Sequence, residues 1–288
     1  MPSWLHALVL GIVQGLTEFI PVSSSGHLVL VPAWFGWARP GLAFDVALHV
    51  GTLVALLAFY RRDLLVMARA VVSRSAAPDA RAARRLVGLL AVASVPVAIA
   101  GGLLRSRVEV AFTSPRLAAM LLFVTAALLV IAEVARARRV RRSPAGEVDV
   151  ADPDADVGDP AGTTVARMGW RHAVTIGVGQ AVAILPGISR SGTTITAGIA
   201  AGLTRPAAAR FAFLLGIPAI GGATVVSLPD LARLQGVGPV DLMVGMAAAA
   251  VSGYLAIHLL VRLVSRAGLH ALVAYLVLVG AASLWRFG

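Results

Sequence analysis

The chain has 288 residues, of which 58% are hydrophobic and only 14% are charged, and its mean hydropathy is +0.86. Soluble domains carry fewer apolar and more charged residues, so this composition excludes an ordinary soluble protein and predicts an integral membrane protein. Cysteine is absent, which excludes disulfides and thiolate chemistry, and the net charge of +11 comes from 25 basic residues that are all arginine. Because the arginines lie between apolar spans, we expect them in cytoplasmic loops and expect no nucleic-acid binding.

The first polar segment of the chain runs from Gly11 to His27 and interrupts apolar sequence. It predicts two short helices, residues 4 to 20 and 24 to 37, separated by Pro21 and three serines. Proline ends a helix by removing a backbone donor, and serine prefers the cap of the next helix. We therefore expect a re-entrant hairpin whose tip stays in the membrane, where protein or a water-filled cavity satisfies its backbone. The alternative is a single kinked span.

The rest of the chain repeats this plan. A second polar segment, Gly177 to Thr193, predicts another pair of short helices, 170 to 185 and 192 to 203, with Pro186 and Gly187 between them. Each pair precedes three apolar stretches that are long enough for the roughly 20 helical residues that a bilayer core requires. The six expected spans lie near 43 to 60, 86 to 104, 116 to 135, 207 to 227, 239 to 263 and 268 to 286.

Three crossings is an odd number, so the second half must be inverted relative to the first. The predicted fold class is an all-α polytopic membrane protein with two inverted-topology repeats, each a re-entrant helical hairpin plus three transmembrane helices. We expect one integral membrane domain over 1–288: repeat one at 1–135, a cytoplasmic linker at 136–168 and repeat two at 169–288.

Arginine placement predicts the orientation. Segment 61 to 85 carries seven arginines and segment 136 to 171 carries seven more, and both follow spans that end on the same side. That side is expected to be cytoplasmic, so both termini and the first hairpin open outward. The acidic stretch Glu147 to Asp159 lacks the glycine and final glutamate of an EF-hand loop, so we expect a disordered linker there and no metal site.

The two polar segments are versions of one motif, 166 positions apart. Only the first copy carries a carboxylate and an imidazole, Glu18 and His27, and only the second carries a guanidinium, Arg190. If the copies face each other, an anion is held from one side and attacked from the other, as in phosphoryl transfer. The shared residues pair Gln14 with Gln180, Ser23 with Ser189, Ser25 with Ser191 and Gly26 with Gly192.

Gln14 and Glu18 stand four apart on one helix face, which suits coordination of a hard divalent cation. One carboxylate and one amide do not complete a site, so substrate phosphate and water must supply the other ligands. The alternative is a structural ion pair between Glu18 and Arg190, because a charge in a membrane segment requires a partner.

Ser23, Ser24, Ser25, Gly26 and His27 lie at the start of the second short helix, where free N–H groups form an anion site. His27 is a candidate base toward a serine hydroxyl, or a nucleophile itself. Simple helix capping is the alternative for the serines, and a satisfied polar contact is the alternative for the histidine.

Arg190 lies among the hydroxyls of Ser189, Ser191 and Thr194 at another helix start. Its planar fork matches phosphate oxygens. Asp45 and His49, four residues apart, either extend the same polar cavity or pair with each other or with a loop.

These motifs identify the family that the chain resembles. Residues 14–27 (QGLTEFIPVSSSGH) and 186–194 (PGISRSGTT) resemble the two signature motifs of bacterial undecaprenyl-diphosphate phosphatases of the bacitracin-resistance type, and the similarity covers nearly the whole chain. Two features depart from the family. Gln14 stands where many members have glutamate, which weakens a two-carboxylate metal site, and the acidic insert is longer than expected.

The resemblance implies hydrolysis of undecaprenyl diphosphate to the monophosphate at the outer face of the cytoplasmic membrane. That step recycles the lipid carrier for peptidoglycan synthesis, gives bacitracin resistance and requires a divalent cation, magnesium or calcium. By motif position, Gln14 and Glu18 hold metal and Ser24 and His27 lie at the reacting phosphate. Arg190, Ser189 and Thr194 bind the diphosphate.

We expect in-line attack on the terminal phosphorus, with Ser24 as nucleophile and His27 as its base; in a variant, His27 activates water or attacks directly. The rival function is a transporter or flippase of a lipid phosphate or small anion, since inverted repeats with hairpins near the membrane midplane are transporter architecture. The glycine-rich spans also permit the close packing of a homodimer.

Overall fold

The computed structural model describes residues 4–39, 41–73, 75–142, 162–232, 237–266 and 268–288. The described residues form helices and one isolated parallel bridge between Thr163 and Leu203. The predicted acidic linker, Glu147 to Asp159, lies outside the described residues. The helices of the first half are α1 (Trp4–Phe19), α2 (Ser24–Phe35), α3 (Leu42–Phe59), α4 (Arg61–Ser73), α5 (Pro78–Ala111) and α6 (Pro115–Arg142).

The second half begins with the 3₁₀ turn η1 (Val165–Arg167). Its helices are α7 (Trp170–Val182), α8 (Arg190–Ala200), α9 (Arg205–Val226), α10 (Leu228–Ala232), α11 (Pro239–Arg266) and α12 (His270–Phe287). Six helices of the described chain, α3, α5, α6, α9, α11 and α12, are long and apolar enough to cross a membrane. The six expected spans and the four short helices are therefore confirmed, the described part of the chain is all-helical, and the protein is a multi-pass membrane protein.

Several boundaries differ from the sequence prediction. Arg61–Ser73 was expected as a loop and forms α4, α5 runs from Pro78 to Ala111 and not from about 86 to 104, and α6 continues to Arg142 into the expected linker. Alanine and arginine are good helix formers, and Pro78 is pre-organised for the first turn of a helix. A search for apolar spans misses these segments because they are helical without being apolar.

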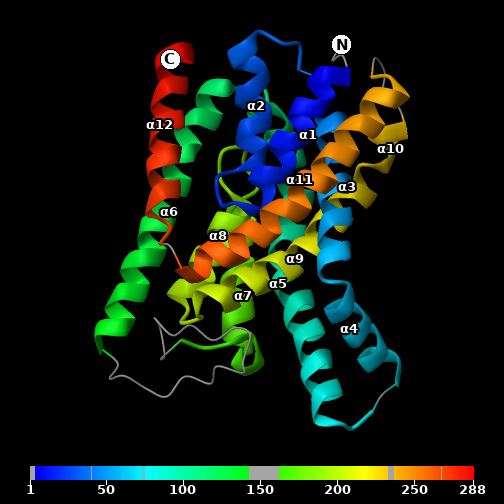
Figure 1. Ribbon diagram of the computed structural model, residues 1–288, viewed down its shortest axis with the longest axis vertical. Coiled ribbons are helices and arrows are strands. Elements are labelled where there is room, and N and C mark those ends of the chain that lie inside the picture. Colours follow the sequence, from blue (N-terminus) through cyan, green and yellow to red (C-terminus); the bar gives the residue numbers. More distant parts are fainter. Residues whose placement is uncertain (1–3, 40, 74, 143–161, 233–236, 267) are drawn as a thin grey trace.

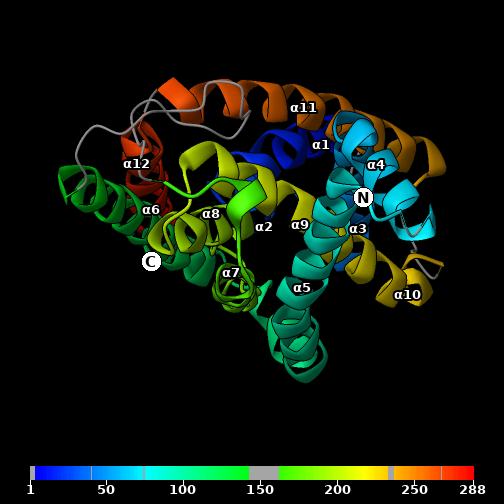
Figure 2. The ribbon, with the colours of Figure 1, turned by 90° about the horizontal axis from the view of Figure 1, so that it is seen from below.

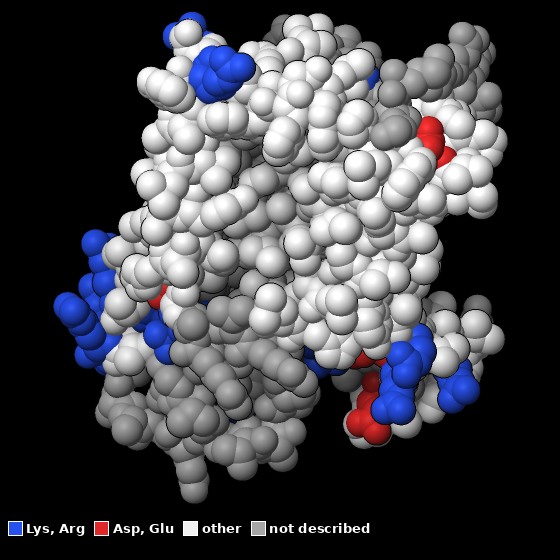
Figure 3. All heavy atoms as spheres, turned by 45° about the horizontal axis from the view of Figure 1, so that its top comes forward, with Lys and Arg blue, Asp and Glu red and all other residues white. Residues whose placement is uncertain are grey.

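The charged and apolar surfaces separate along the long axis. In Figure 1 both termini lie at the upper end, whereas α4 and the arginine-rich end of α6 lie at the lower end. Figure 3 shows basic residues at the left and right edges of the lower half of the visible face and a few at its top, with a broad band almost free of charge between them. Large apolar side chains are exposed, such as Leu103 at 78% and Leu278 at 68%. Such exposure suits a lipid-facing surface.

Glycine lets helices from opposite halves approach closely. α1 packs most extensively on α11, and a Cβ at Gly11 would collide with the carbonyl oxygen of Gly245. In the same way α7 packs on α5, where a Cβ at Gly177 would collide with the backbone of Ala93. Figure 2, seen from the lower end, shows α7, α8 and α9 in the middle, with α5, α6, α11 and α12 around them. The two halves are therefore interlocked, and the short helices lie between the long ones.

Candidate active site

Each short-helix pair is broken where the sequence predicts, and a serine caps the helix after the break. The Ser23 side chain accepts a hydrogen bond from the N–H of Gly26 at the start of α2 (3.3 Å), and Ser189 accepts one from Gly192 at the start of α8 (3.0 Å). Ser23 is the one non-glycine residue of the described chain with a positive φ, +73°. A left-handed serine stores strain that the surroundings must hold, and such strain is common at functional sites.

The two breaks meet. Glu18, near the end of α1, forms an ion pair with Arg190, the first residue of α8, and the carboxylate and guanidinium belong to different halves of the chain. Only 6% of the Glu18 side chain and 16% of the Arg190 side chain are exposed. Because an unpaired charge is costly when it is buried, this contact holds the two turns together and satisfies both ions.

Ser24 is directed at the same carboxylate. Its Oγ donates a hydrogen bond to Glu18 Oε2 at 2.5 Å, and Gln14 Nε2 donates to the same oxygen at 3.1 Å. His49 Nε2, from α3, lies 3.5 Å from Glu18 Oε2. A hydroxyl, a carboxylate and a guanidinium thus lie together. These groups can act as a nucleophile, as its base and as a binding group for phosphate oxygens, respectively.

These groups line a cavity of about 300 Å³ between the two halves. Its wall includes polar residues from both turns and from α3, and apolar residues from α5 and α9. The polar lining consists of Glu18, Ser23, Ser24, Ser25, His49, Ser189, Arg190, Thr224 and Ser227. A polar end and an apolar wall suit a ligand with an anionic headgroup and an apolar chain.

The other predicted binding residues support this cavity without lining it. Ser191 Oγ lies 3.2 Å from Ser189 Oγ, and Thr194 Oγ1 donates to the backbone oxygen of Arg190 at 2.8 Å. Gly26 faces Gly187, and a Cβ at position 26 would lie 3.0 Å from the Gly187 Cα. Ser191 and Thr194 therefore shape the start of α8 that presents Ser189 and Arg190, and Gly26 allows close approach of the second turn to α2.

His27 faces away from Ser24. Its Nδ1 lies 2.8 Å from the backbone oxygen of Ser23, and its Nε2 lies 2.8 Å from the Tyr275 hydroxyl of α12. The His27 and Tyr275 rings are also nearly parallel, at 5° and 5.7 Å between centroids. Both ring nitrogens are therefore engaged, and the base nearest to the Ser24 hydroxyl is Glu18. The expected partnership of His27 with Ser24 is not present in this geometry.

Sequence reasoning undervalued His49 and missed the residues that α5, α9 and their flanking loops add, such as Phe112, Thr224 and Ser227. His49 carried a usable sequence signal, because it follows Asp45 by four residues and both side chains therefore share one face of α3. In the structure, His49 Nδ1 lies 2.7 Å from the Asp45 backbone oxygen. The others are ordinary apolar or hydroxyl residues, so no sequence pattern marks them.

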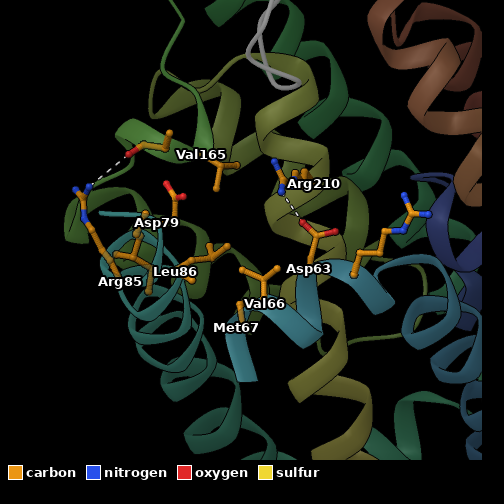
Figure 4. Close-up of a pocket in the computed structure, with 13 residues that line it drawn as sticks. Asp63, Val66, Met67, Asp79, Arg85, Leu86, Val165 and Arg210 are labelled. Atoms are coloured by element: carbon orange, nitrogen blue, oxygen red, sulfur yellow. Dashed lines mark hydrogen bonds and ion pairs between the residues drawn. The ribbon is translucent and has the colours of Figure 1, made fainter. Parts of the chain in front are cut away.

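A second, larger cavity of about 540 Å³ lies among α4, α5, η1 and α9, away from the two turns. Figure 4 shows Asp63 of α4 paired with Arg210 of α9 (2.5 Å), and Asp79 and Arg85 on α5. Its lining contains none of the predicted site residues. Cavity size alone therefore does not identify the reactive site.

Gln14 and Glu18 provide the test of a divalent cation site. Gln14 Oε1 is buried and has no hydrogen-bond partner among the described residues. The described chain holds no cluster of three or more His, Asp or Glu side chains that could enclose a metal by itself. An amide oxygen without a partner next to one carboxylate fits a hard cation only where phosphate and water complete the coordination.

Comparison with known proteins identifies the family of the chain. The family model described as bacitracin resistance protein BacA matches residues 7–282. A protein of Geobacter sulfurreducens named undecaprenyl-diphosphatase is 41% identical over 284 residues, covering 97% of both chains. Proteins with the same name from Gemmatimonas aurantiaca and Methanobrevibacter smithii are 41% and 38% identical, covering 97% and 96% of this chain and 96% and 95% of their own. The aligned length and the family match show that this chain belongs to the bacitracin resistance protein BacA family.

Proposed function

We propose that this protein is an undecaprenyl-diphosphate phosphatase, which hydrolyses undecaprenyl diphosphate to undecaprenyl phosphate and inorganic phosphate. The BacA family match and the names of relatives about 40% identical over nearly the whole chain support this activity. One contact in the site supports it most directly, the hydrogen bond from Ser24 Oγ to Glu18 Oε2 beside Arg190. The reaction regenerates the lipid carrier of cell-wall synthesis and thereby confers resistance to bacitracin.

In the proposed mechanism, Ser24 Oγ attacks the terminal phosphorus while its proton passes to Glu18. The bond from that phosphorus to the bridging oxygen breaks, and undecaprenyl phosphate leaves with the bridging oxygen. Water then displaces the phosphoryl group from Ser24 as inorganic phosphate, and Glu18 returns the proton to Ser24 Oγ. Glu18 replaces His27 as the base because Glu18, not His27, accepts the Ser24 hydrogen bond.

Arg190 has two tasks in this scheme. Without substrate it neutralises Glu18, and with substrate its remaining N–H groups bind the oxygens of the diphosphate, where negative charge increases during transfer. Ser23, Ser25 and Ser189 line the same cavity and add hydroxyl donors.

Gln14 and Glu18 are the proposed ligands of a magnesium or calcium ion, with the substrate completing the coordination. Such an ion, when bound, supplies charge neutralisation at the phosphoryl oxygens. Replacing Gln14 by glutamate adds a second carboxylate, so Gln14→Glu is expected to lower the magnesium concentration that gives half-maximal activity. An unchanged magnesium dependence in this variant, or full activity of the wild type in excess chelator, would contradict the assignment.

The proposed architecture is a pair of inverted repeats, each with a re-entrant hairpin, α1–α2 and α7–α8. Both halves follow one order: two short helices, a long helix, a shorter one and two long helices. The packing corresponds as well, because α1 lies on α11 and α7 lies on α5. With the arginine-rich end in the cytoplasm, the first hairpin and both termini face the outer side of the bacterial cytoplasmic membrane.

The decisive test is phosphate release by purified protein in detergent from a long-chain polyprenyl diphosphate, with magnesium and with chelator. Glu18→Ala and Arg190→Ala are expected to abolish release. Asp241→Ala and Arg286→Ala are matched controls, since neither side chain lines the cavity, and they should keep normal turnover. No release by folded wild-type protein would exclude the phosphatase and direct attention to anion transport in vesicles.

The nucleophile is tested separately by comparing two neighbouring serines. Ser24→Ala is expected to remove turnover because it deletes the attacking oxygen. Ser25→Ala should have a much smaller effect, since Ser25 Oγ is directed at Ser23 Oγ (3.4 Å) and not at Glu18. After brief mixing with substrate labelled in the terminal phosphate, protein-bound label should form on wild type and not on Ser24→Ala. Full activity of Ser24→Ala would assign the attack to water.

A further inference from the structure

The cavity of about 300 Å³ that holds Glu18, Ser24 and Arg190 is called the reaction cavity here, and a further cavity adjoins it. The further cavity has a volume of about 450 Å³ and lies between the α2–α3 connection, the start of α3, the α5–α6 turn and the end of α9. Leu42, Val46, Phe112 and Ser227 line both cavities, so the two spaces are direct neighbours. We call this second space the vestibule. Its own lining residues are Arg39, Gly41, Ala43 and Thr113.

Arg39 supplies the one charged group in the described lining of the vestibule, and the hydroxyl residues Thr113 and Ser227 accompany it. Asp45, the acidic partner of Arg39, is 2% exposed and is not part of the lining. The carboxylate therefore lies behind the guanidinium, and the vestibule presents a cation and hydroxyls to its contents.

The Arg39 guanidinium is held in place from several sides. Its Nη2 donates to Asp45 Oδ2 at 2.7 Å, its Nη1 donates to the backbone oxygen of Phe112, and its Cζ lies 5.3 Å from the centre of the Phe112 ring. Arginine carries five N–H groups, and these two bonds use two of them. A fixed guanidinium with N–H groups to spare binds an oxyanion with little further loss of side-chain freedom.

Polar contacts also join this arginine to the reactive groups. Asp45, which holds Arg39, accepts a contact from His49 Nδ1 through its backbone oxygen at 2.7 Å, and His49 Nε2 lies 3.5 Å from Glu18 Oε2. Asp45 and His49 are on the same face of α3. The vestibule and the reaction cavity are therefore neighbouring spaces linked by polar contacts, and each has an arginine held by a carboxylate.

We propose that the vestibule is a second anion subsite, in which Arg39, with Thr113 and Ser227, binds a phosphate group. The ligand is either the second phosphate group of the lipid diphosphate or the inorganic phosphate that leaves the reaction cavity. This inference rests on the proposed phosphatase function for its substrate, but phosphate binding by Arg39 can be measured without turnover.

The test uses Arg39→Gln/Asp45→Asn, because removing Arg39 alone would leave Asp45 buried and unpaired. The first measurement is equilibrium binding of radiolabelled inorganic phosphate to purified full-length protein. We expect the double variant to bind about tenfold more weakly than wild type, which corresponds to the loss of one charge-assisted hydrogen bond. Arg286→Gln, an exposed arginine at the outer end of α12, is the matched control and should bind as wild type does.

Steady-state kinetics then separate the two sources of phosphate. If the subsite takes released phosphate, the double variant has a higher inhibition constant for phosphate and an unchanged KM for polyprenyl diphosphate. If it takes the second phosphate of the lipid, KM for the diphosphate increases by a similar factor, and the affinity for a monophosphate of the same chain does not change. Arg39→Lys, which keeps the charge, should recover part of either effect.

The proposal is overturned if the double variant matches wild type in phosphate binding, phosphate inhibition and KM, or if Arg286→Gln reproduces its defects. Failure of the phosphatase function has a different signature, since wild-type protein would then release no phosphate while the Arg39-dependent binding of phosphate remained.

Discussion

At the scale of single residues, the site depends on one carboxylate. Glu18 pairs with Arg190, accepts from Ser24 and Gln14, and lies beside His49. A buried ion pair contributes little net stability, but removing one partner leaves an uncompensated charge. Substitutions at Glu18 and Arg190 are therefore expected to affect folding as well as turnover, and conservative changes are the more informative ones.

Arg190→Lys tests the geometry of the phosphate clamp. Lysine keeps the charge that Glu18 requires but offers a point charge in place of a planar fork, so we expect kcat/KM for the lipid diphosphate to fall by about tenfold or more, with the protein still folded. Phosphate release and thermal unfolding in detergent provide the two readouts. Near-normal kcat/KM would show that the fork is not required.

Tyr275→Phe tests whether His27 positions Ser24 through its contact with the Ser23 backbone. The Tyr275 hydroxyl contacts His27 Nε2, and His27 Nδ1 contacts the backbone oxygen of Ser23, the strained residue before Ser24. Losing one neutral hydrogen bond should lower kcat by up to about tenfold and leave KM unchanged. Tyr254→Phe is the control, because Tyr254 packs against Phe59 and His258 on another helix, away from the cavity. Equal losses in both variants would remove this role.

At the scale of helices, close packing and hydrogen bonds from neighbouring helices to the helix ends fix the positions of the short helices. Thr125 Oγ1 of α6 donates to the backbone oxygen of Gly187 at 2.8 Å and accepts from the N–H of Ser189 at 2.9 Å. Arg139 of α6 donates to the backbone oxygens of Ile199 and Leu203, both at 2.9 Å. Helix α6 thus provides hydrogen-bond partners for backbone groups at both ends of α8. These bonds fix the position of α8 and keep Arg190 next to Glu18.

Gly187→Ala is the sharpest test of this packing. Gly187 has φ +102°, and a Cβ there would collide with the carbonyl oxygen of Ala118. A strained backbone and a close contact together predict destabilisation of about 1 to 3 kcal/mol, seen as a lower thermal unfolding temperature in detergent. Gly221→Ala, in α9 with no atom within 4 Å of the added Cβ, should be neutral or slightly stabilising. Equal unfolding temperatures would contradict the expected collision.

At the scale of the whole molecule, the charge distribution predicts the orientation in the membrane, and the interlocked halves assemble the site. The arginine-rich end opposes the end that carries both termini, as the positive-inside rule requires of one cytoplasmic face (Figure 1). Two ion pairs join the halves near the arginine-rich end. Asp63 of α4 pairs with Arg210 of α9, and Glu133 of α6 pairs with Arg205 of α9. The two halves therefore cannot separate without breaking these two ion pairs as well as the pair of Glu18 with Arg190 in the reaction cavity.

The orientation is tested with cysteines, because the natural chain has none and gives no background. Ser75→Cys lies between α4 and α5, and Ala38→Cys lies between α2 and α3, and both positions are exposed. In intact cells a membrane-impermeant maleimide is expected to label Ala38→Cys and not Ser75→Cys, and both should react after the cells are lysed. The opposite pattern would place the first hairpin on the cytoplasmic side.

The sequence by itself determined the six spans, the four short helices and the breaks with serine at the start of the next helix, because hydropathy, proline and capping chemistry act over a few residues. It did not determine α4, which is helical without being apolar. Only the tertiary structure decided the partners, because these contacts join distant positions. Glu18 pairs with Arg190, which is 172 positions away in the sequence. His27 contacts Tyr275, 248 positions away, and not the expected partner Ser24. Local rules show that a buried carboxylate needs a partner, but which group reaches it depends on how α1, α3 and α8 pack.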